Sequence, residues 1–297
     1  HRVDRRQRQM CIRDRRRTAL PALVVGAIAL GAVLTSAPAS AATLGSTVPA
    51  ATAGEACTPG TRVFTPEAPP ALALLGAEDA NRVATGRGVV VAVVDSGIDA
   101  GNPHLAGVVI GGVDLVGDGE RADGLSDTTG HGTAIAGQIA AQPVDGSGVV
   151  GLAPDARLLS VRVFRSNQQQ DKDKGFGPTS QRIADGIHWA ADNGADIINV
   201  SISQETDSPD LRAAVEHASA VGALVVASGG NRASDPDAKD GARYPAGYEQ
   251  VLGVSAADAS GRANDASIHG PQVGVTAPGM NVLSAALGGG DLSLIHI

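Results

Sequence analysis

The chain has 297 residues, is 43% hydrophobic but only 2% aromatic, and contains 39 glycines and two cysteines. This composition excludes a collagen, a coiled coil and a disulfide-stapled miniprotein, and it favours an α/β protein with buried, Val-rich strands. Beyond residue 42 the chain carries 15 basic and 29 acidic side chains, a net charge of −14, so nucleic acid is not an expected partner.

The first 42 residues are typical of an export signal. A basic segment ending at Arg17 precedes an uncharged apolar run, residues 18–34, and small residues of the A-x-A kind follow it. We therefore expect a cleaved signal peptide over residues 1–42 and a secreted or cell-envelope protein. An N-terminal membrane anchor is the alternative, because the apolar run is close to the length that spans a bilayer.

The two ends of the chain differ in character from what lies between them. Residues 1–13 precede the natural start of a signal peptide, and residues 293–297 break the pattern abruptly, so both read as non-native sequence flanking a gene fragment. Residues 43–71 are expected to form an N-terminal arm, and an organised domain covers residues 72–292. The arm's Cys57 is expected to be a free thiol or an intermolecular link, because the other cysteine lies ahead of the signal peptide.

Apolar runs alternate with amphipathic helical patterns through this domain. Strands are expected over residues 89–94, 158–164, 196–202, 224–227, 251–255 and 273–277. Helices are expected over residues 131–141 and 180–193, and from an N-cap at Ser208. This alternation predicts an α/β fold, a mostly parallel sheet with helices on both faces, in which functional sites collect at the carboxyl ends of the strands.

Three polar stretches lie at strand ends or helix starts. Residues 95–99 (Asp-Ser-Gly-Ile-Asp) follow the first strand, where an acid serves as a turn residue, a metal ligand, a phosphate acceptor or the orienting member of a triad. His131 lies between two glycines that leave its imidazole open to neighbours, although a lone histidine there is usually a surface residue or a cap. Asn231 follows two glycines, and it either makes a turn or donates its amide to a developing oxyanion.

Taken together, these stretches resemble the subtilase family of serine peptidases, whose motifs D-S/T-G, H-G-T-x-x-A-G and x-G-N occur in the same order. The resemblance covers about residues 72–287. It implies that Asp95 orients and stabilises an imidazolium, that His131 acts as general base and then acid, and that Asn231 donates to the oxyanion. It also places two walls of the primary specificity pocket at Ser201, Ile202 and Ser203 and at Ser228, Gly229 and Gly230.

The motif that carries the family's nucleophile, G-T-S-x-A-x-P, is absent from the chain. Ser284 matches a small residue at the end of a family strand, and Ser293 lacks the flanking glycine and alanine. Two interpretations stay open. One is a secreted serine endopeptidase truncated before its serine, which leaves this fragment inactive and its fold incomplete at the C-terminus. The other is a pseudopeptidase or non-catalytic cell-envelope scaffold with the same fold.

Several features resemble the mycosin-like branch, exported peptidases that accompany type VII secretion; an ordinary secreted subtilase is the alternative. About 45 residues separate the expected cleavage site from Gly88, too few for the usual inhibitory prodomain, and residues 184–190 and 210–215 look like that branch. The resemblance implies protein or peptide substrates, the type VII machinery as a partner, and a membrane anchor in a missing C-terminal segment. The arm-to-histidine-motif disulfide of that branch is not matched, because residues 127–129 contain no cysteine.

No cofactor or metal site is expected from the sequence. Subtilases often bind calcium through acidic loops, but calcium needs six to eight converging oxygens that a sequence cannot reveal. The acids that lie in suitable loops are Asp123, Asp127, Asp171 and Asp173.

Overall fold

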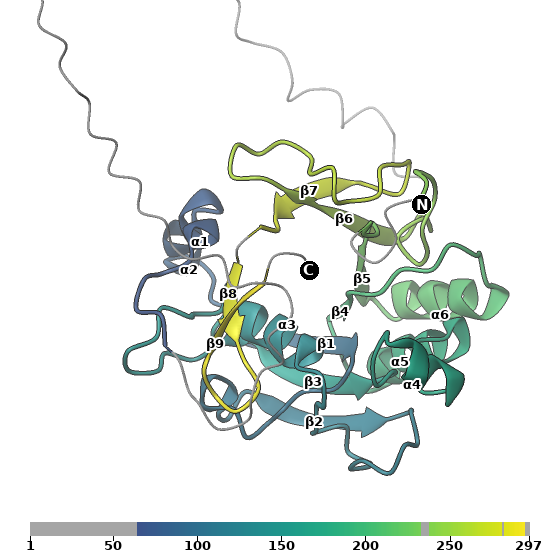
Figure 1. Ribbon diagram of the computed structural model, residues 1–297, viewed down its shortest axis with the longest axis horizontal. Coiled ribbons are helices and arrows are strands. Elements are labelled where there is room, and N and C mark those ends of the chain that lie inside the picture. The colour runs from purple at the N-terminus through teal and green to yellow at the C-terminus, as the bar shows by residue number, and fades with distance from the viewer. Residues whose placement is uncertain (1–63, 233–237, 281, 295–297) are drawn as a thin grey trace, which may run out of the picture. The chain divides into compact units, whose positions relative to one another are not determined.

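The computed structural model describes residues 64–232, 238–280 and 282–294, which all belong to one compact unit, Ala53–Ile297 (Figure 1). The expected signal peptide and most of the N-terminal arm, including Cys57, lie outside the described residues. Within the described residues, no helix is both long enough and apolar enough to cross a membrane.

Seven parallel strands form the central sheet, in the order β2-β3-β1-β4-β5-β6-β7. Their bounds are Val90–Asp95 (β1), Val109–Asp114 (β2), Arg157–Arg162 (β3), Ile197–Val200 (β4), Leu224–Ser228 (β5), Val251–Ala257 (β6) and Val275–Pro278 (β7). The predicted parallel α/β fold is confirmed. Strand β1 lies between β3 and β4, so the order of strands departs from the chain order around it, which is where α/β sheets bind ligands.

Helices cover both faces of this sheet, as the alternation of patterns predicts. The helices are α1 (Pro70–Leu74), α2 (Ala77–Asn81), α3 (His131–Ala140), α4 (Gln169–Asp173), α5 (Ser180–Asp192) and α6 (Pro209–Ala220), with a 3-10 turn at Pro103–Leu105. Side chains of β1 alternate between the faces: Ala92 and Val94 pack in the core formed with α5 and α6, whereas Val91 and Val93 pack in the core formed with α3. Figure 1 shows α3 inside the curve of the sheet and α5 and α6 outside it.

Helix α6 begins where the sequence predicts. The Ser208 side chain accepts a hydrogen bond from Leu211 N (3.4 Å), and Pro209 occupies the first helical position. The hydroxyl thus satisfies a backbone donor that the helix itself leaves unpaired.

Replacing Ser208 with alanine should therefore lower the free energy of unfolding by about 1 kcal/mol, the usual value of an N-cap. Urea denaturation of the two proteins measures the difference. The control is Ser219→Ala, an exposed position near the other end of the same helix, which should change stability little. Equal losses in both variants would show that the cap contributes nothing.

Two parts of the fold were not expected. Edge strand β2 contains Gly111 and Gly112, which weaken its apolar pattern; a Cβ on Gly112 would lie 2.1 Å from Ser160 O, so the close approach to β3 needs glycine. Strands β8 (Val282–Ala285) and β9 (Asp291–Leu294) form an antiparallel hairpin. The hairpin packs on α3, where a Cβ on Gly137 would meet Ala285 Cβ at 2.8 Å.

Candidate active site

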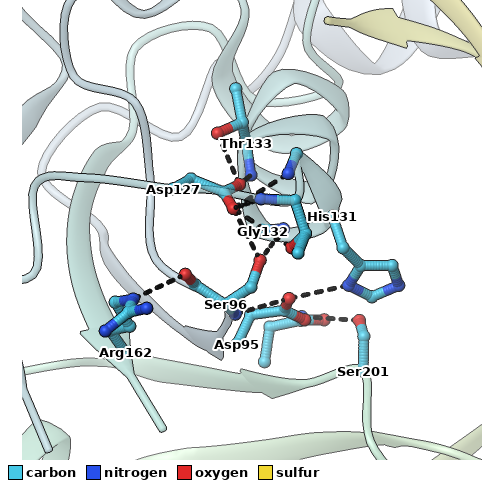
Figure 2. A network of polar contacts seen from close by, with 11 residues as sticks. Asp95, Ser96, Asp127, His131, Gly132, Thr133, Arg162 and Ser201 are labelled. Carbon is cyan, nitrogen blue, oxygen red and sulfur yellow. Dashed lines mark hydrogen bonds and ion pairs between the residues drawn. The ribbon is translucent and has the colours of Figure 1, made fainter. Parts of the chain in front are cut away.

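An aspartate and a histidine meet at the carboxyl end of the central strand. Asp95 is the last residue of β1 and fully buried, and its Oδ1 lies 2.7 Å from Nδ1 of His131, the first residue of α3 (Figure 2). Ser96 N donates a second hydrogen bond to the same oxygen at 2.7 Å. The other oxygen, Oδ2, is buried without a hydrogen-bond partner in the described part of the chain. The His131 side chain is 36% exposed, so the imidazole is held on one side and accessible on the other.

Asp127 fixes the start of α3 against the turn that follows β1. Its carboxylate accepts hydrogen bonds from Gly130 N (2.9 Å) and Thr133 N (3.0 Å), and from the hydroxyls of Thr133 (2.7 Å) and Ser96 (3.0 Å). An acid is also electrostatically favoured at a helix N-terminus. Because Ser96 follows Asp95 and Gly130 precedes His131, this one carboxylate ties together both halves of the acid–base pair, as Figure 2 shows.

Glycine at position 132 allows that approach. A Cβ on Gly132 would lie 2.1 Å from Gly97 O, so no larger residue fits between α3 and the turn after β1. The Gly132 N–H instead donates to Ser96 Oγ at 3.0 Å. The glycines that flank His131 in the sequence are thus partly explained by packing.

A buried arginine supports the same turn from the neighbouring strand. Arg162 pairs with Asp95 in the register of β3 and β1, is fully buried, and donates from Nε to Ser96 O at 3.2 Å. Its guanidinium also bonds Asp118 (2.7 and 2.8 Å) and Asp114 (2.9 Å). The hydrogen bond from Arg162 is the largest influence that lowers the pKa of Asp118. Arg162 is therefore paired, as a buried charge must be.

The charge of Asp95 controls the proton on His131. Attraction to Asp95 is the largest cause that raises the pKa of His131, to about 8; burial opposes it, while the hydrogen bond that His131 donates to Asp95 and the charge of Asp127 add to it. The arrangement thus stabilises an imidazolium. With a pKa of about 8, about one tenth of His131 is neutral base at pH 7 and about one half at pH 8, so both states that general acid–base catalysis needs are populated.

We expect Asp95→Asn to lower the pKa of His131 toward its ordinary 6.5 or below, because the attraction disappears while the burial remains. An NMR titration of the His131 Cε1 proton measures both values. Since the folded pKa lies above the unfolded one, the pair stabilises the wild-type fold below about pH 6.5, and this contribution is lost as the pH rises through about 8. Asp185→Asn, an exposed change on α5, is the control; an unshifted His131 in Asp95→Asn would contradict the assignment.

A pocket of about 180 Å³ lies at the carboxyl ends of β4, β5, β6 and β7, and it brings together three residues predicted for the site: Ser201, Ser228 and Asn231. The side chain of Asn231 makes no hydrogen bond to the described residues, and the residue is exposed, so its amide is free to donate to a ligand. Its backbone is held by a bridge to Ser267.

The other residues predicted for the pocket walls do not line this pocket. They are Ile202, Ser203, Gly229 and Gly230. Ile202 is buried in the core that also contains residues of α5 and α6. Gly230 has φ +104°, and a Cβ there would lie 2.9 Å from Arg243 Cγ, so glycine is required for the turn that presents Asn231.

Two amide side chains that were not predicted from the sequence line both this pocket and a second pocket of about 220 Å³. Gln138 of α3 and Asn199 of β4 line both, together with Ser201. Asn199 Nδ2 donates to Ser201 Oγ at 3.0 Å, whereas Gln138 Nε2 is buried without a partner in the described residues. A polar residue on the otherwise apolar face of α3 was the available signal.

Among the side chains described, no serine hydroxyl bonds to Nε2 of His131. Ser96 Oγ donates to Asp127 and accepts from Gly132, and Ser284 Oγ is buried and donates to Ala134 O on α3. Both hydroxyls are therefore occupied by structural contacts.

The four acids considered for calcium have separate partners, and Asp171 and Asp173 lie in helix α4 and not, as expected, in a loop. Asp123 pairs with Arg121, Asp171 accepts from Ser166, and Asp173 accepts from Gln169. Asp127 caps α3, as described above. No hydrogen bond or ion pair among the described residues gives two of these acids a common partner.

A buried carboxylate that holds an imidazole at the end of a parallel strand, beside a pocket with an exposed amide, has the arrangement of the acid–base half of a serine-hydrolase triad. The subtilase family model matches residues 86–295, and the chain belongs to this family of serine-type peptidases.

The chain is similar to bacterial serine proteases. The chain is 36% identical over 200 residues to the major intracellular serine protease of Bacillus subtilis, covering 67% of this chain and 60% of that protein. It is 34% identical over 222 residues to thermitase of Thermoactinomyces vulgaris, covering 72% and 74%. The chain thus spans about 60% of the length of the first of these relatives.

Solved structures of mycosins are also similar. MycP1 from Mycobacterium smegmatis aligns with a TM-score of 0.66 at 29% identity, covering 80% of this chain and 72% of that one. The MycP3 protease from the type VII (ESX-3) secretion system aligns with the same TM-score and identity, covering 80% and 75%.

Proposed function

We propose that the protein is an exported serine endopeptidase in which Asp95 and His131 activate a serine supplied by chain that follows residue 297. The observation that carries the proposal is the 2.7 Å contact between a fully buried Asp95 and a half-exposed His131 whose pKa is raised to about 8. Nδ1–H of the imidazole donates to Asp95, which leaves Nε2 as the basic nitrogen on the accessible side.

In the proposed reaction, Nε2 of His131 takes the hydroxyl proton while the serine oxygen bonds to the scissile carbonyl carbon. The carbonyl electron pair moves onto its oxygen, and the Asn231 amide, which makes no hydrogen bond to the described residues, donates to the oxyanion. The imidazolium is stabilised by the buried charge of Asp95. It then gives its proton to the leaving amine, and water completes the cycle by releasing the acyl group.

The pH profile of peptide hydrolysis tests this role. The protein extended through the coding sequence that follows residue 297 should hydrolyse peptides with a kcat/KM that rises as His131 loses its proton, near pH 8. Residues 43–297 alone should show no hydrolysis, because the base then has no hydroxyl to activate. Hydrolysis by residues 43–297, or a profile flat through pH 6–9, would overturn the proposal.

We further propose that the enzyme belongs to the mycosin-like branch and processes proteins exported with a type VII secretion system. Support comes from the structural similarity to MycP1 and MycP3 and from the export signal expected in residues 1–42. Deleting the gene and comparing exported proteins by mass spectrometry tests this. Uncleaved precursors of type VII substrates are expected in the deletion strain; an unchanged set would leave the peptidase assignment standing and reject the branch.

A further inference from the structure

Two histidines and an aspartate converge on the α5–α6 layer, outside the catalytic site. His188 and Asp192 lie one turn apart on α5, and Nδ1 of His188 is 3.2 Å from Asp192 Oδ2. His217 of α6 reaches the other carboxylate oxygen of Asp192 with its Nε2, at 2.7 Å. One ligand atom from each residue lies within 4.8 Å of the other two.

The positions of these residues favour a cation. Asp192 is the last residue of α5, and His217 is in the last turn of α6, so the negative ends of both helix dipoles face the cluster. A hollow of about 250 Å³ beside His188 is also lined by Asp185 and Asp210, which add negative charge. The helix dipole disfavours a carboxylate at a helix C-terminus, so Asp192 needs a positively charged partner there, either a protonated histidine of the cluster or a bound cation.

The ion pairs of Asp192 with the two histidines contribute little to the stability of the fold. The side chains of His188 and Asp192 are each 52% exposed and that of His217 is 31% exposed, and exposed ion pairs contribute little stability. The two imidazole rings stack with centroids 4.0 Å apart and planes 6° from parallel, an arrangement that is unfavourable when both rings are protonated.

We propose that His188, Asp192 and His217 form a binding site for a divalent transition-metal ion, with zinc as the representative, that clamps α5 to α6. Two imidazole nitrogens and one carboxylate oxygen suit Zn²⁺, Ni²⁺ or Cu²⁺, whereas Ca²⁺ and Mg²⁺ prefer oxygen ligands alone. Metal–ligand bonds of about 2.0–2.2 Å place neighbouring ligand atoms about 3–3.5 Å apart, and one ligand atom from each of the three residues already lies within 4.8 Å of the others, so the side chains need to move little to close on an ion. Water would complete the coordination.

Binding requires one ring to turn. A metal ion lies close to the plane of each imidazole that binds it. Because the two rings are stacked with nearly parallel planes, no position of the ion lies in both planes. The exposure of His188 gives its ring room to tilt about its side-chain bonds. The three ligands therefore lie close together but are not yet in coordination geometry. We expect a Zn²⁺ affinity in the micromolar range, weaker than that of closed structural zinc sites. Since α5 and α3 cover opposite faces of the sheet, the metal should not contact His131.

Isothermal titration of the full chain with ZnCl₂ tests the proposal. We expect one site that is weakened about tenfold or more in each of His188→Gln, Asp192→Asn and His217→Gln. His269→Gln, at an exposed histidine outside the cluster, is the matched control and should bind as the wild type does. The midpoint temperature of thermal unfolding should rise when ZnCl₂ is added to the wild type and to this control, but not when it is added to the cluster variants.

Electron paramagnetic resonance with Cu²⁺ provides a second readout. The bound Cu²⁺ should show hyperfine coupling to two imidazole nitrogens in the wild type and to one in either histidine variant. Circular dichroism without metal checks that the variants fold. The proposal is overturned if the wild type binds Zn²⁺ no more tightly than millimolar, or if the triple variant keeps the wild-type affinity, which would place the ion on other histidines or cysteines of the chain.

Discussion

Replacing His131 with alanine should lower kcat by about four to six orders of magnitude in the protein extended through its nucleophile, because the members of a triad act as a unit. The reason lies in the geometry. Only the imidazole connects the buried charge of Asp95 to the accessible side of the site, since Asp95 Oδ1 bonds Nδ1 and has no direct route to a substrate. Without the base, the serine hydroxyl keeps its proton and attacks poorly.

Steady-state kinetics on a fluorogenic peptide measure this loss, and His269→Ala, an exposed histidine, is the matched control. KM should change little in His131→Ala, because the residue does not line the 180 Å³ pocket beside it. A loss of less than tenfold would remove His131 from the reaction.

Replacing Asn231 with alanine should lower kcat by about 10²–10³ with little change in KM. The side chain is exposed at the rim of the pocket and has no hydrogen bond to the described residues, so its removal should not disturb the fold. Its amide gains a full partner only when negative charge develops on the carbonyl oxygen, and the effect therefore falls on the transition state.

Asn231→Asp tests the same point more sharply, since it keeps the size of the side chain but replaces the donor by an acceptor; it should lose at least as much activity as alanine. Asn193→Ala, at the end of α5, is the control on a distant surface. A change confined to KM would make Asn231 a binding or turn residue instead.

Much of the fold was predictable because it follows from local pattern. The apolar run at residues 89–94 became β1, and the N-cap and proline at Ser208 and Pro209 began α6 as expected. Edge strand β2 was missed because its glycines serve a close approach to Ser160, a contact that only the folded sheet creates. The β8–β9 hairpin was missed for a similar reason, since its strands are short and are held against α3.

The candidate site was only partly predictable. Asp95 and His131 could be identified by their glycine-rich sequence surroundings. The residues that hold them in place could not. Asp127 was considered only as a calcium ligand, whereas its carboxylate holds the start of α3 through Gly130 and Thr133 and also accepts from Ser96. Arg162 interrupts an apolar run, yet its partners Ser96 and Asp118 lie 66 and 44 residues away, so the sequence alone could not identify them.

The most direct test of the central claim is to label the protein, extended beyond residue 297, with a fluorophosphonate and to locate the modified residue by mass spectrometry. Asp95 and His131 should activate one serine, located after residue 297, and the label should disappear in His131→Ala. Labelling of a serine within residues 64–294 would contradict this account, as would labelling that persists without His131.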